Sequence, residues 1–206
     1  MNELVLKLKK QGVLKTSRII EAFLAIDRKK FLPRDLVAEA YVDAPLSIGQ
    51  GQTISQPYTV AFMLELLDPR PKQKILDVGF GSGWTTALLA YIVGSGGEVY
   101  GLEIVLEIFE RGKGNLLKFK LENVQLVHGS GWDGFPGTAP FDRILVSAAS
   151  PEIPKALTDQ LAIGGKMVIP VGSNLNCSIH LIKKVSENDF IIEEFPGFAF
   201  VPLIKK

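Results

Sequence analysis

The sequence predicts an α/β protein built on a mostly parallel, Rossmann-like sheet, with helices on both faces of the sheet. Three observations carry this prediction. From residue 72 onward, short apolar runs alternate with helical patterns, which is typical of strand–helix–strand units. A glycine-rich turn separates the first of these strands from its helix. The last two apolar runs are joined by only a polar turn, which predicts an antiparallel hairpin at one edge.

The composition limits the class of protein. The chain has 206 residues, of which 47% are hydrophobic, enough for one compact unit with a substantial core. Lys and Arg number 23 and Asp and Glu number 22, so the net charge of +1 gives no electrostatic reason to expect nucleic acid or a membrane surface as partner. One Cys and two His exclude an intrachain disulfide and a Cys- or His-rich zinc site. No signal peptide or membrane span is apparent, so we expect a cytoplasmic protein.

Residues 1–70 are predicted to form a helical and loop extension to a sheet domain at 71–206. Apolar side chains at helical spacing predict helices over 18–26 and 58–67. Between them, residues 44–57 are rich in Gly, Gln, Ser and Pro and show little periodicity. We interpret this segment as a long loop, which is either functional or a plain surface connection.

The sheet domain is predicted from alternating patterns, although two glycines at 112 and 114 each cost their helix about 1 kcal/mol relative to Ala. In chain order the patterns predict strand 74–78, helix 84–93, strand 98–102, helix 105–121, strands 123–127 and 141–146, helix 153–161, strand 165–170, and the paired strands 178–185 and 190–204.

The turn Gly79-Phe-Gly-Ser-Gly83 lies between the first strand and its helix. Glycines let the backbone turn tightly there, and the helix N-terminus offers free N–H groups to a ligand. Glu103 ends the next strand, where a carboxylate can accept hydrogen bonds from both hydroxyls of a ribose. The glycines alone are also compatible with a plain structural turn. The ordered combination with Glu103 favours a nucleotide-type ligand.

The loop differs from a dinucleotide fingerprint, because its third glycine comes one residue early and Trp84 stands in the expected place. Asp77 puts a carboxylate beside the loop, which would repel a pyrophosphate but not an ammonium group. The pattern therefore favours a ligand with a zwitterionic amino-acid end, such as the methionine part of S-adenosylmethionine.

Several segments match one known family over nearly the whole chain. The most specific is Pro45-Leu-Ser-Ile-Gly-Gln-Gly-Gln-Thr-Ile-Ser-Gln-Pro57, preceded by Ala40-Tyr41. Further matches are Leu76-Asp-Val-Gly-Phe-Gly-Ser-Gly83, Ala139-Pro-Phe-Asp142, Pro170-Val-Gly172 and Phe200-Val-Pro-Leu203. On these residues the chain resembles the protein-L-isoaspartate O-methyltransferase family.

The resemblance implies a class I methyltransferase fold, with a seven-stranded sheet whose last strand is antiparallel. It implies that S-adenosylmethionine donates a methyl group to the α-carboxylate of L-isoaspartyl residues in damaged proteins or peptides, leaving S-adenosyl-L-homocysteine. A carboxylate is already ionised at neutral pH, so such an enzyme needs alignment rather than a base. This explains why the chain can have so few His and Cys residues. We expect a monomer with no metal, nucleic acid or membrane partner.

The resemblance also implies roles for individual residues. Ser55 is the expected catalytic-site hydroxyl, and Thr53 and Ile54 line the same loop. Ser130 stands where the family usually has an Asp that contacts adenine, so we predict intact but weaker cofactor binding. The complete cofactor set expected is Thr53, Ile54, Ser55, Asp77, Gly79, Gly81, Gly83, Glu103, Ser130 and Gly131.

Two alternatives stay open at the level of sequence. The first is a class I methyltransferase with another acceptor, a small molecule or RNA. The second is a relative that binds the cofactor with little activity, and it is motivated by Ser130, Gly112 and Gly114. The near-neutral charge argues against RNA, and the segment 44–57 argues against a generic small-molecule enzyme.

Overall fold

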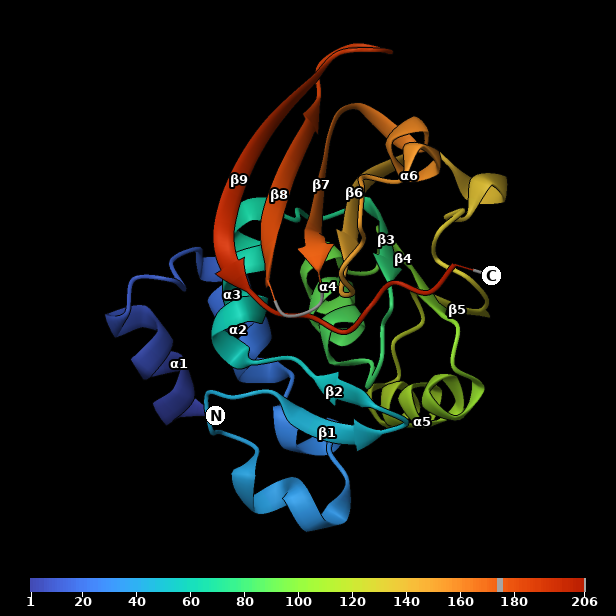
Figure 1. The fold of residues 1–206 in the computed structure, drawn as a ribbon. Coiled ribbons are helices and arrows are strands. Elements are labelled where there is room, and N and C mark those ends of the chain that lie inside the picture. The colour runs from blue at the N-terminus through green and yellow to red at the C-terminus, as the bar shows by residue number, and fades with distance from the viewer. Residues whose placement is uncertain (174–175, 206) are drawn as a thin grey trace.

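The computed structural model describes residues 1–173 and 176–205. Within these residues a seven-stranded sheet forms the centre of the molecule (Figure 1). Its strands from β5 to β7 are parallel, and β8 and β9 each run antiparallel to their neighbours. The predicted sheet and its edge hairpin are therefore confirmed. The order across the sheet is β5 (Val124–His128), β4 (Glu98–Glu103), β3 (Lys74–Val78), β6 (Phe141–Val146), β7 (Leu161–Ser173), β8 (Asn176–Lys184) and β9 (Phe190–Phe198).

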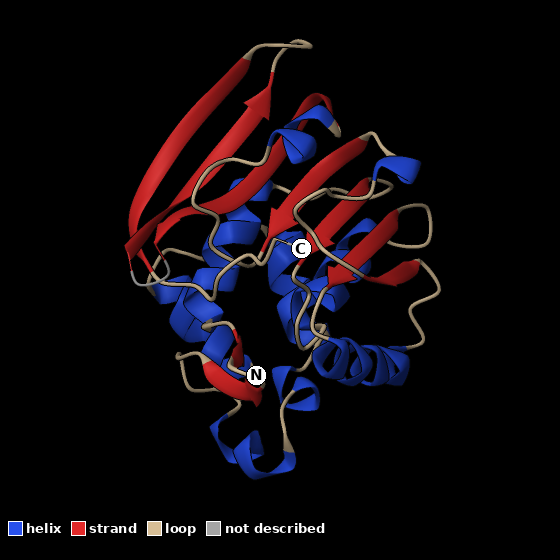
Figure 2. Cartoon of the chain, turned by 45° about the vertical axis from the view of Figure 1, so that its right-hand side comes forward, coloured by secondary structure: helices blue, strands red, loops and turns tan. Residues whose placement is uncertain are grey.

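Helices cover the two faces of the sheet unequally (Figure 2). Five helices share one apolar core with one face, and the opposite face is covered by the short α6 and loops. The larger layer holds α1 (Asn2–Lys10), α2 (Ser17–Ala25), α3 (Pro57–Leu67), α4 (Trp84–Val93) and α5 (Leu106–Leu116), and the other holds α6 (Lys155–Asp159).

The alternation of side chains along β3 decides which residues meet which layer. Ile75 belongs to the core under the five helices, whereas Leu76 and Val78 belong to the core on the α6 side. Asp77 points in the same direction as Ile75, which puts its carboxyl group under the first turn of α4.

The prediction of a loop without secondary structure over 44–57 was wrong. The segment forms a small antiparallel hairpin of β1 (Leu46–Gly49) and β2 (Gln52–Ile54). Its turn passes through Gly49, Gln50 and Gly51, which all have positive φ angles of 89°, 53° and 68°. The sequence hid the hairpin because Gln is not a usual residue for such a turn.

Several element boundaries also differ from the prediction, including those of β7 and of α5, which ends at Leu116. The helix expected over 153–161 is only five residues long, because β7 begins at Leu161. The strand expected to reach residue 204 ends at Phe198. The tail that follows β9 is held by two backbone hydrogen bonds to Ala149. The N–H of Ala149 donates to the carbonyl of Val201 (2.8 Å), and the N–H of Leu203 donates to the carbonyl of Ala149 (2.7 Å). The tail thereby crosses the carboxyl ends of the strands (Figure 1).

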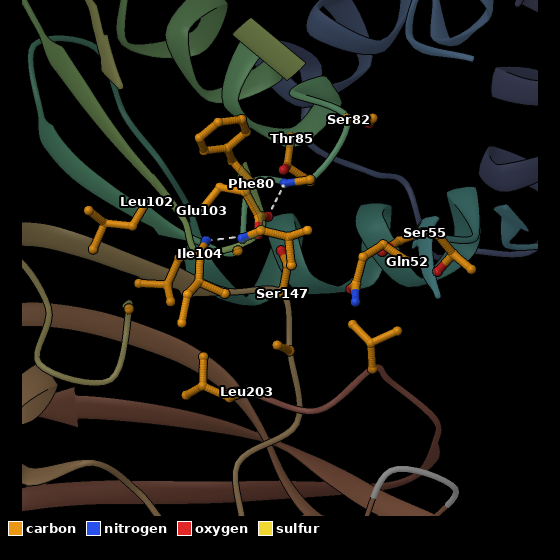
Figure 3. A pocket seen from close by; sticks show the side chains of 18 of the residues that line it. Gln52, Ser55, Phe80, Ser82, Thr85, Leu102, Glu103, Ile104, Ser147 and Leu203 are labelled. Atoms are coloured by element: carbon orange, nitrogen blue, oxygen red, sulfur yellow. Dashed lines mark hydrogen bonds between the residues drawn. The ribbon is translucent and has the colours of Figure 1, made fainter. Parts of the chain in front are cut away.

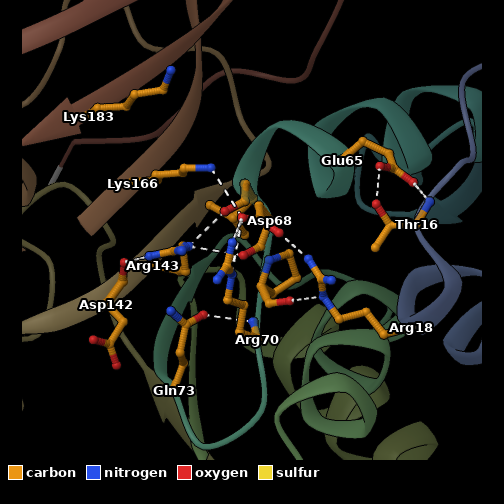
Figure 4. Close-up of polar contacts among 12 residues, drawn as sticks. Thr16, Arg18, Glu65, Asp68, Arg70, Gln73, Asp142, Arg143, Lys166 and Lys183 are labelled. Atoms are coloured by element: carbon orange, nitrogen blue, oxygen red, sulfur yellow. Dashed lines mark hydrogen bonds and ion pairs between the residues drawn. The ribbon is translucent and has the colours of Figure 1, made fainter. Parts of the chain in front are cut away.

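A polar cluster ties the end of α3 to the amino-terminal edge of the sheet (Figure 4). Asp68 is the C-cap of α3 and pairs with Arg18, Arg70 and Lys166. The side chain of Arg143 donates to the last carbonyl of α3 (Nε–O 2.7 Å). These contacts hold residues 1–70 against the sheet at the end of β3 opposite the glycine loop, and the division at residue 70 stays a prediction. In the described part of the chain, no helix is both long enough and apolar enough to cross a bilayer.

Candidate active site

A cleft opens at the carboxyl ends of β3, β4 and β6 (Figure 3). In the sheet, β4 and β5 lie on one side of β3, whereas β6 and β7 lie on its other side. The order of the strands therefore reverses between β3 and β6. Ligands of open α/β sheets bind at such a switch point. The cleft has a volume of about 750 Å³, including the part open to solvent. Its walls are the glycine loop, the end of β4, the β1–β2 hairpin and residues 201–204 of the tail.

The glycine loop has the conformation that its residue types allow. Gly79, Gly81 and Gly83 have positive φ angles of 73°, 53° and 88°, which L side chains rarely adopt. The first two N–H groups of the loop donate to the end of β4, at 2.8 and 3.1 Å. Gly79 and Gly81 line the cleft, whereas Gly83 is the N-cap of α4 and faces α5.

Helix α5 packs against this loop at unusually short range. A Cβ atom on Gly112 would lie 2.4 Å from the carbonyl oxygen of Gly81 and 2.6 Å from the ring of Phe80. A Cβ on Gly114 would meet nothing within 4 Å. From sequence both glycines are only a cost to the helix. The structure shows that Gly112 permits the contact with the glycine loop and that Gly114 has no such role.

Asp77 lies behind the loop and does not line the cleft, because its exposed fraction is 0%. Its Oδ2 accepts hydrogen bonds from the hydroxyls of Thr86 (2.6 Å) and Thr85 (3.1 Å). Its Oδ1 has no hydrogen-bond partner in the described part of the chain. Burial raises the pKa of the Asp77 carboxyl to about 6, and the negative charge of Glu103 adds to the effect.

Glu103 ends β4 and lines the cleft, where it is the one charged side chain among the described lining residues. Its two carboxylate oxygens accept hydrogen bonds from the N–H groups of Gly81 (3.1 Å), Ile104 (2.9 Å) and Val105 (2.9 Å). The carboxylate is thereby fixed beside the glycine loop (Figure 3). The cleft carries a negative charge and no positive one on the described residues that line it.

A second groove, of about 1050 Å³ including the part open to solvent, adjoins the cleft between the hairpin, the start of α3 and residues 197–201. None of the described residues that line it is charged. Four residues line both cavities, namely Thr53, Ser55, Ser147 and Val201. The structure thus brings Ser55, the expected catalytic-site residue, to the junction of the two cavities, which Ser147 also lines.

The adenine end of the predicted site is only partly assembled. Gly131 lines the cleft, packed so closely on β3 that a Cβ would lie 2.1 Å from Val78 Cγ1. Ser130 does not line it. Its hydroxyl accepts a hydrogen bond from the N–H of Trp132 (3.2 Å) and donates to the carbonyl of Ile204 (3.4 Å).

Of the predicted cofactor residues, seven line the cleft and three do not. The three that do not are Asp77, Gly83 and Ser130. Sequence reasoning missed several lining residues, including Phe80, Ser147 and the tail segment 201–204. The position of Ser147 directly after β6 was an available signal, because strand ends of a parallel sheet meet at one edge. The apolar pattern of residues 190–204 predicts a strand, so the sequence gives no sign that the tail lies over the cleft.

Comparison with known proteins decides the family. A family model described as protein-L-isoaspartate(D-aspartate) O-methyltransferase matches residues 1–206. This chain belongs to that family. The relatives named protein-L-isoaspartate O-methyltransferase include one from Methanopyrus kandleri, 45% identical over 98% of this chain and 89% of its own length. Another, from Anaeromyxobacter dehalogenans, is 51% identical over 90% of this chain and 88% of its own.

Solved structures of the protein-L-isoaspartate O-methyltransferase family share the fold. A Plasmodium falciparum chain described under the same name was crystallised with S-adenosyl-L-homocysteine. It superposes with a TM-score of 0.88 at 27% identity, covering 99% of this chain and 98% of its own. The family, the class I methyltransferase fold and the dependence on S-adenosylmethionine predicted from the sequence are therefore confirmed.

The cleft suits a sulfonium cofactor with an amino-acid end. It has one free carboxylate oxygen on Asp77 behind the glycine loop and the fixed carboxylate of Glu103 beside it. The glycines with positive φ leave space where a side chain would otherwise project. The assignment of individual contacts to the cofactor stays a prediction.

Proposed function

We propose that this chain methylates the α-carboxylate of L-isoaspartyl residues in proteins, with the cofactor in the cleft and the substrate chain in the adjoining groove. The observation that carries the proposal is the junction of the two cavities. Thr53, Ser55 and Ser147 place three hydroxyl groups there, and the described lining includes no cation. A methyl donor and a methyl acceptor must come together at the transferred carbon, so their two binding sites need to share a wall.

The cofactor side is held mainly by backbone and acids. Glu103 would accept hydrogen bonds from the ribose, and Gly79 and Gly81 would let the loop approach the methionine end. The negative charge of Asp77, buried behind the loop with its Oδ1 unpaired in the described part of the chain, would favour the ammonium group. When bound, S-adenosylmethionine would supply both the methyl group and the leaving group. The bond between the carboxylate oxygen and the methyl carbon would form as the sulfur–methyl bond breaks, with S-adenosyl-L-homocysteine as the leaving group.

The substrate side is suited to a carboxylate that must stay reactive. Ser55, Thr53 and Ser147 can donate hydrogen bonds that orient one carboxylate oxygen and leave the other free to react. A Lys or Arg at this place would bind the carboxylate more tightly and stabilise the ground state, which slows transfer. The absence of a cation on the described lining is therefore an expected property of this site rather than a defect.

The test is transfer of a labelled methyl group to a peptide containing one L-isoaspartyl residue, with the matching aspartyl peptide as control. We expect labelling of the first peptide only. The Ser55→Ala variant should lose roughly tenfold to 100-fold in kcat, as when one positioned donor is removed, while its Kd for S-adenosylmethionine stays within about twofold.

Each alternative has its own outcome in this assay. Cofactor binding without methyl transfer, unchanged by Ser55→Ala, would mean a relative with little activity. Transfer to both peptides, or to neither while small carboxylic acids are labelled, would mean another acceptor. Within the same proposal we keep the sequence-based expectations of a cytoplasmic monomer, for which light scattering of the purified chain tests the second point.

A further inference from the structure

We infer that Arg28 is a positioning residue that sets the place of Ser55 relative to the glycine loop. The inference rests on the proposed role of Ser55. Arg28 begins the short 3₁₀ turn Arg28–Phe31 after α2, and its exposed fraction is 0%.

The guanidinium of Arg28 donates to four backbone carbonyls and to no carboxylate among the described residues. One terminal nitrogen bonds the carbonyls of Ala40 (2.9 Å) and Val42 (3.2 Å). The other bonds the carbonyls of Ala44 (2.9 Å) and Ser55 (3.0 Å). Three acceptors lie on the segment that enters the β1–β2 hairpin, and the fourth belongs to Ser55 itself, just after the hairpin ends. One planar group therefore fixes the entry and the exit of the hairpin to each other.

The same group also contacts the cofactor side. Its central carbon lies 5.4 Å from the ring centroid of Trp84, the first residue of α4 after the glycine loop. The indole N–H of Trp84 donates to the carbonyl of Ile26 (3.3 Å), two residues before Arg28. Arg28 thus joins the loop that carries the substrate-side hydroxyl to the helix that begins at the cofactor loop.

Stability alone does not explain a charge at this position. Burial lowers the pKa of the Arg28 guanidinium to about 10, although the negative charge of Asp43 acts to raise it. The Nε of Arg28 has no hydrogen-bond partner in the described part of the chain. A buried cation is costly, and a well-packed apolar side chain often replaces one without loss of stability. The rigid fork of donors is what an apolar residue, or the single ammonium of Lys, does not reproduce.

Transfer of a methyl group is sensitive to such positioning, because a displacement of about 1 Å at a reacting group can cost about 100-fold in rate. We therefore expect Arg28→Lys and Arg28→Met to lower kcat for the isoaspartyl peptide roughly tenfold to 100-fold, and by no more than Ser55→Ala does. The Kd for S-adenosylmethionine should rise less than about threefold, since the polar contacts on that side come from the glycine loop and Glu103. The folded fraction of each variant is measured by cofactor titration, so that kcat refers to folded enzyme.

Arg143 offers a matched control. It is also buried, and it donates to carbonyls of Leu67, Asp68 and Asp142 at the opposite end of the sheet. Arg143→Lys should lower stability and leave kcat per folded molecule within about twofold. Equal losses of kcat in the Arg28→Lys and Arg143→Lys variants would overturn the inference, because they would indicate a general structural effect.

A double-variant cycle isolates the action through Ser55. If Arg28 acts by placing Ser55, then Ser55→Ala combined with Arg28→Lys should be no more than about threefold slower than Ser55→Ala alone. Multiplication of the two losses would overturn the inference and leave the proposed function intact. A wild-type enzyme that does not label the isoaspartyl peptide would instead overturn the proposed function.

Amide hydrogen exchange gives a readout that needs no activity. In Arg28→Lys, peptides covering 44–56 should exchange faster, while those covering β7 and β8 stay as in the wild type. Unchanged exchange at 44–56 would show that Arg28 does not hold the hairpin.

Discussion

The groups beside the glycine loop, which we assign to the cofactor side, come from one continuous stretch, residues 77–103, whereas the groove proposed for the substrate combines the hairpin and start of α3, the end of β6 and the tail after β9. The first is made of backbone N–H groups, glycines and two acids on the ends of neighbouring parallel strands. The second is made of uncharged side chains on segments that lie far apart in the sequence. The cofactor side therefore depends on local backbone conformation, and the substrate side depends on long-range contacts such as those of Arg28.

This difference determines what each side tolerates. The glycine loop contacts α5 so closely that no methyl group fits between them, so it is sensitive to any larger side chain at this contact. A junction of hydroxyl groups is sensitive instead to the loss or displacement of a donor. On the cofactor side, we expect the largest effect from an added methyl group, a smaller one from the loss of a charge, and the smallest from a change in one hydrogen bond.

The largest effect is expected from Gly112→Ala. Its new methyl group would overlap the carbonyl of Gly81, and overpacking of this kind costs about 1–3 kcal/mol. We expect the affinity for S-adenosylmethionine, measured by isothermal titration, to fall roughly tenfold to 100-fold. Gly114→Ala is the control in the same helix. It should leave the affinity unchanged and raise the free energy of unfolding by up to about 1 kcal/mol. Equal affinities of the two variants would refute the proposed contact.

An intermediate effect is expected from the protonation of Asp77. Its pKa is about 6 in the ligand-free protein, so below that pH an increasing fraction of the protein carries no negative charge behind the loop. Affinity for the positively charged cofactor should fall by up to about tenfold per pH unit between pH 6 and 5. Titration calorimetry at pH 5.0 and 7.5 measures this, and Asp77→Asn should bind weakly with little pH dependence.

The same group affects stability with the opposite sign. Because the folded-state pKa is raised from 3.8 to about 6, Asp77 favours folding fully below pH 3.8, and this contribution is lost as the pH rises through 6. The ligand-free protein should lose about 3 kcal/mol from this group over that window, and Asp77→Asn should not. Urea unfolding at pH 4.5 and 7.5, compared between wild type and variant, should show about 2 kcal/mol of this loss, because pH 4.5 already lies inside the window. A wild type that responds to pH as the variant does would contradict the raised pKa.

The smallest effect is expected at the adenine end. The hydroxyl of Ser130 contacts Trp132 and Ile204 and does not line the cleft. A carboxylate there would accept a stronger hydrogen bond by about 1 kcal/mol, so Ser130→Asp should tighten S-adenosylmethionine binding roughly twofold to fivefold. Equal affinities in wild type and variant would remove the idea that Ser130 weakens binding.

The parts of the fold that followed from the sequence are those governed by local patterns. The apolar run of β3, the glycines after it and Glu103 at the end of β4 lie within thirty residues of one another, and hydrogen bonds between neighbouring strands bring them together. The hairpin was missed because Gln50 has a positive φ angle that its residue type does not announce. Gly112 was counted as a cost, since no pattern shows that another segment approaches it within contact distance.

The sequence by itself determined the sheet, the glycine loop with its acids, and the family to which the chain belongs. Only the tertiary structure decided that Ser147 and the tail join Ser55 at one junction and that Arg28 donates a hydrogen bond to the carbonyl of Ser55. The physical reason is the range of the interactions. Periodicity and turn chemistry act between residues a few positions apart, whereas Arg28 bonds a carbonyl 27 positions away, and such a pairing exists only once the chain has closed around it.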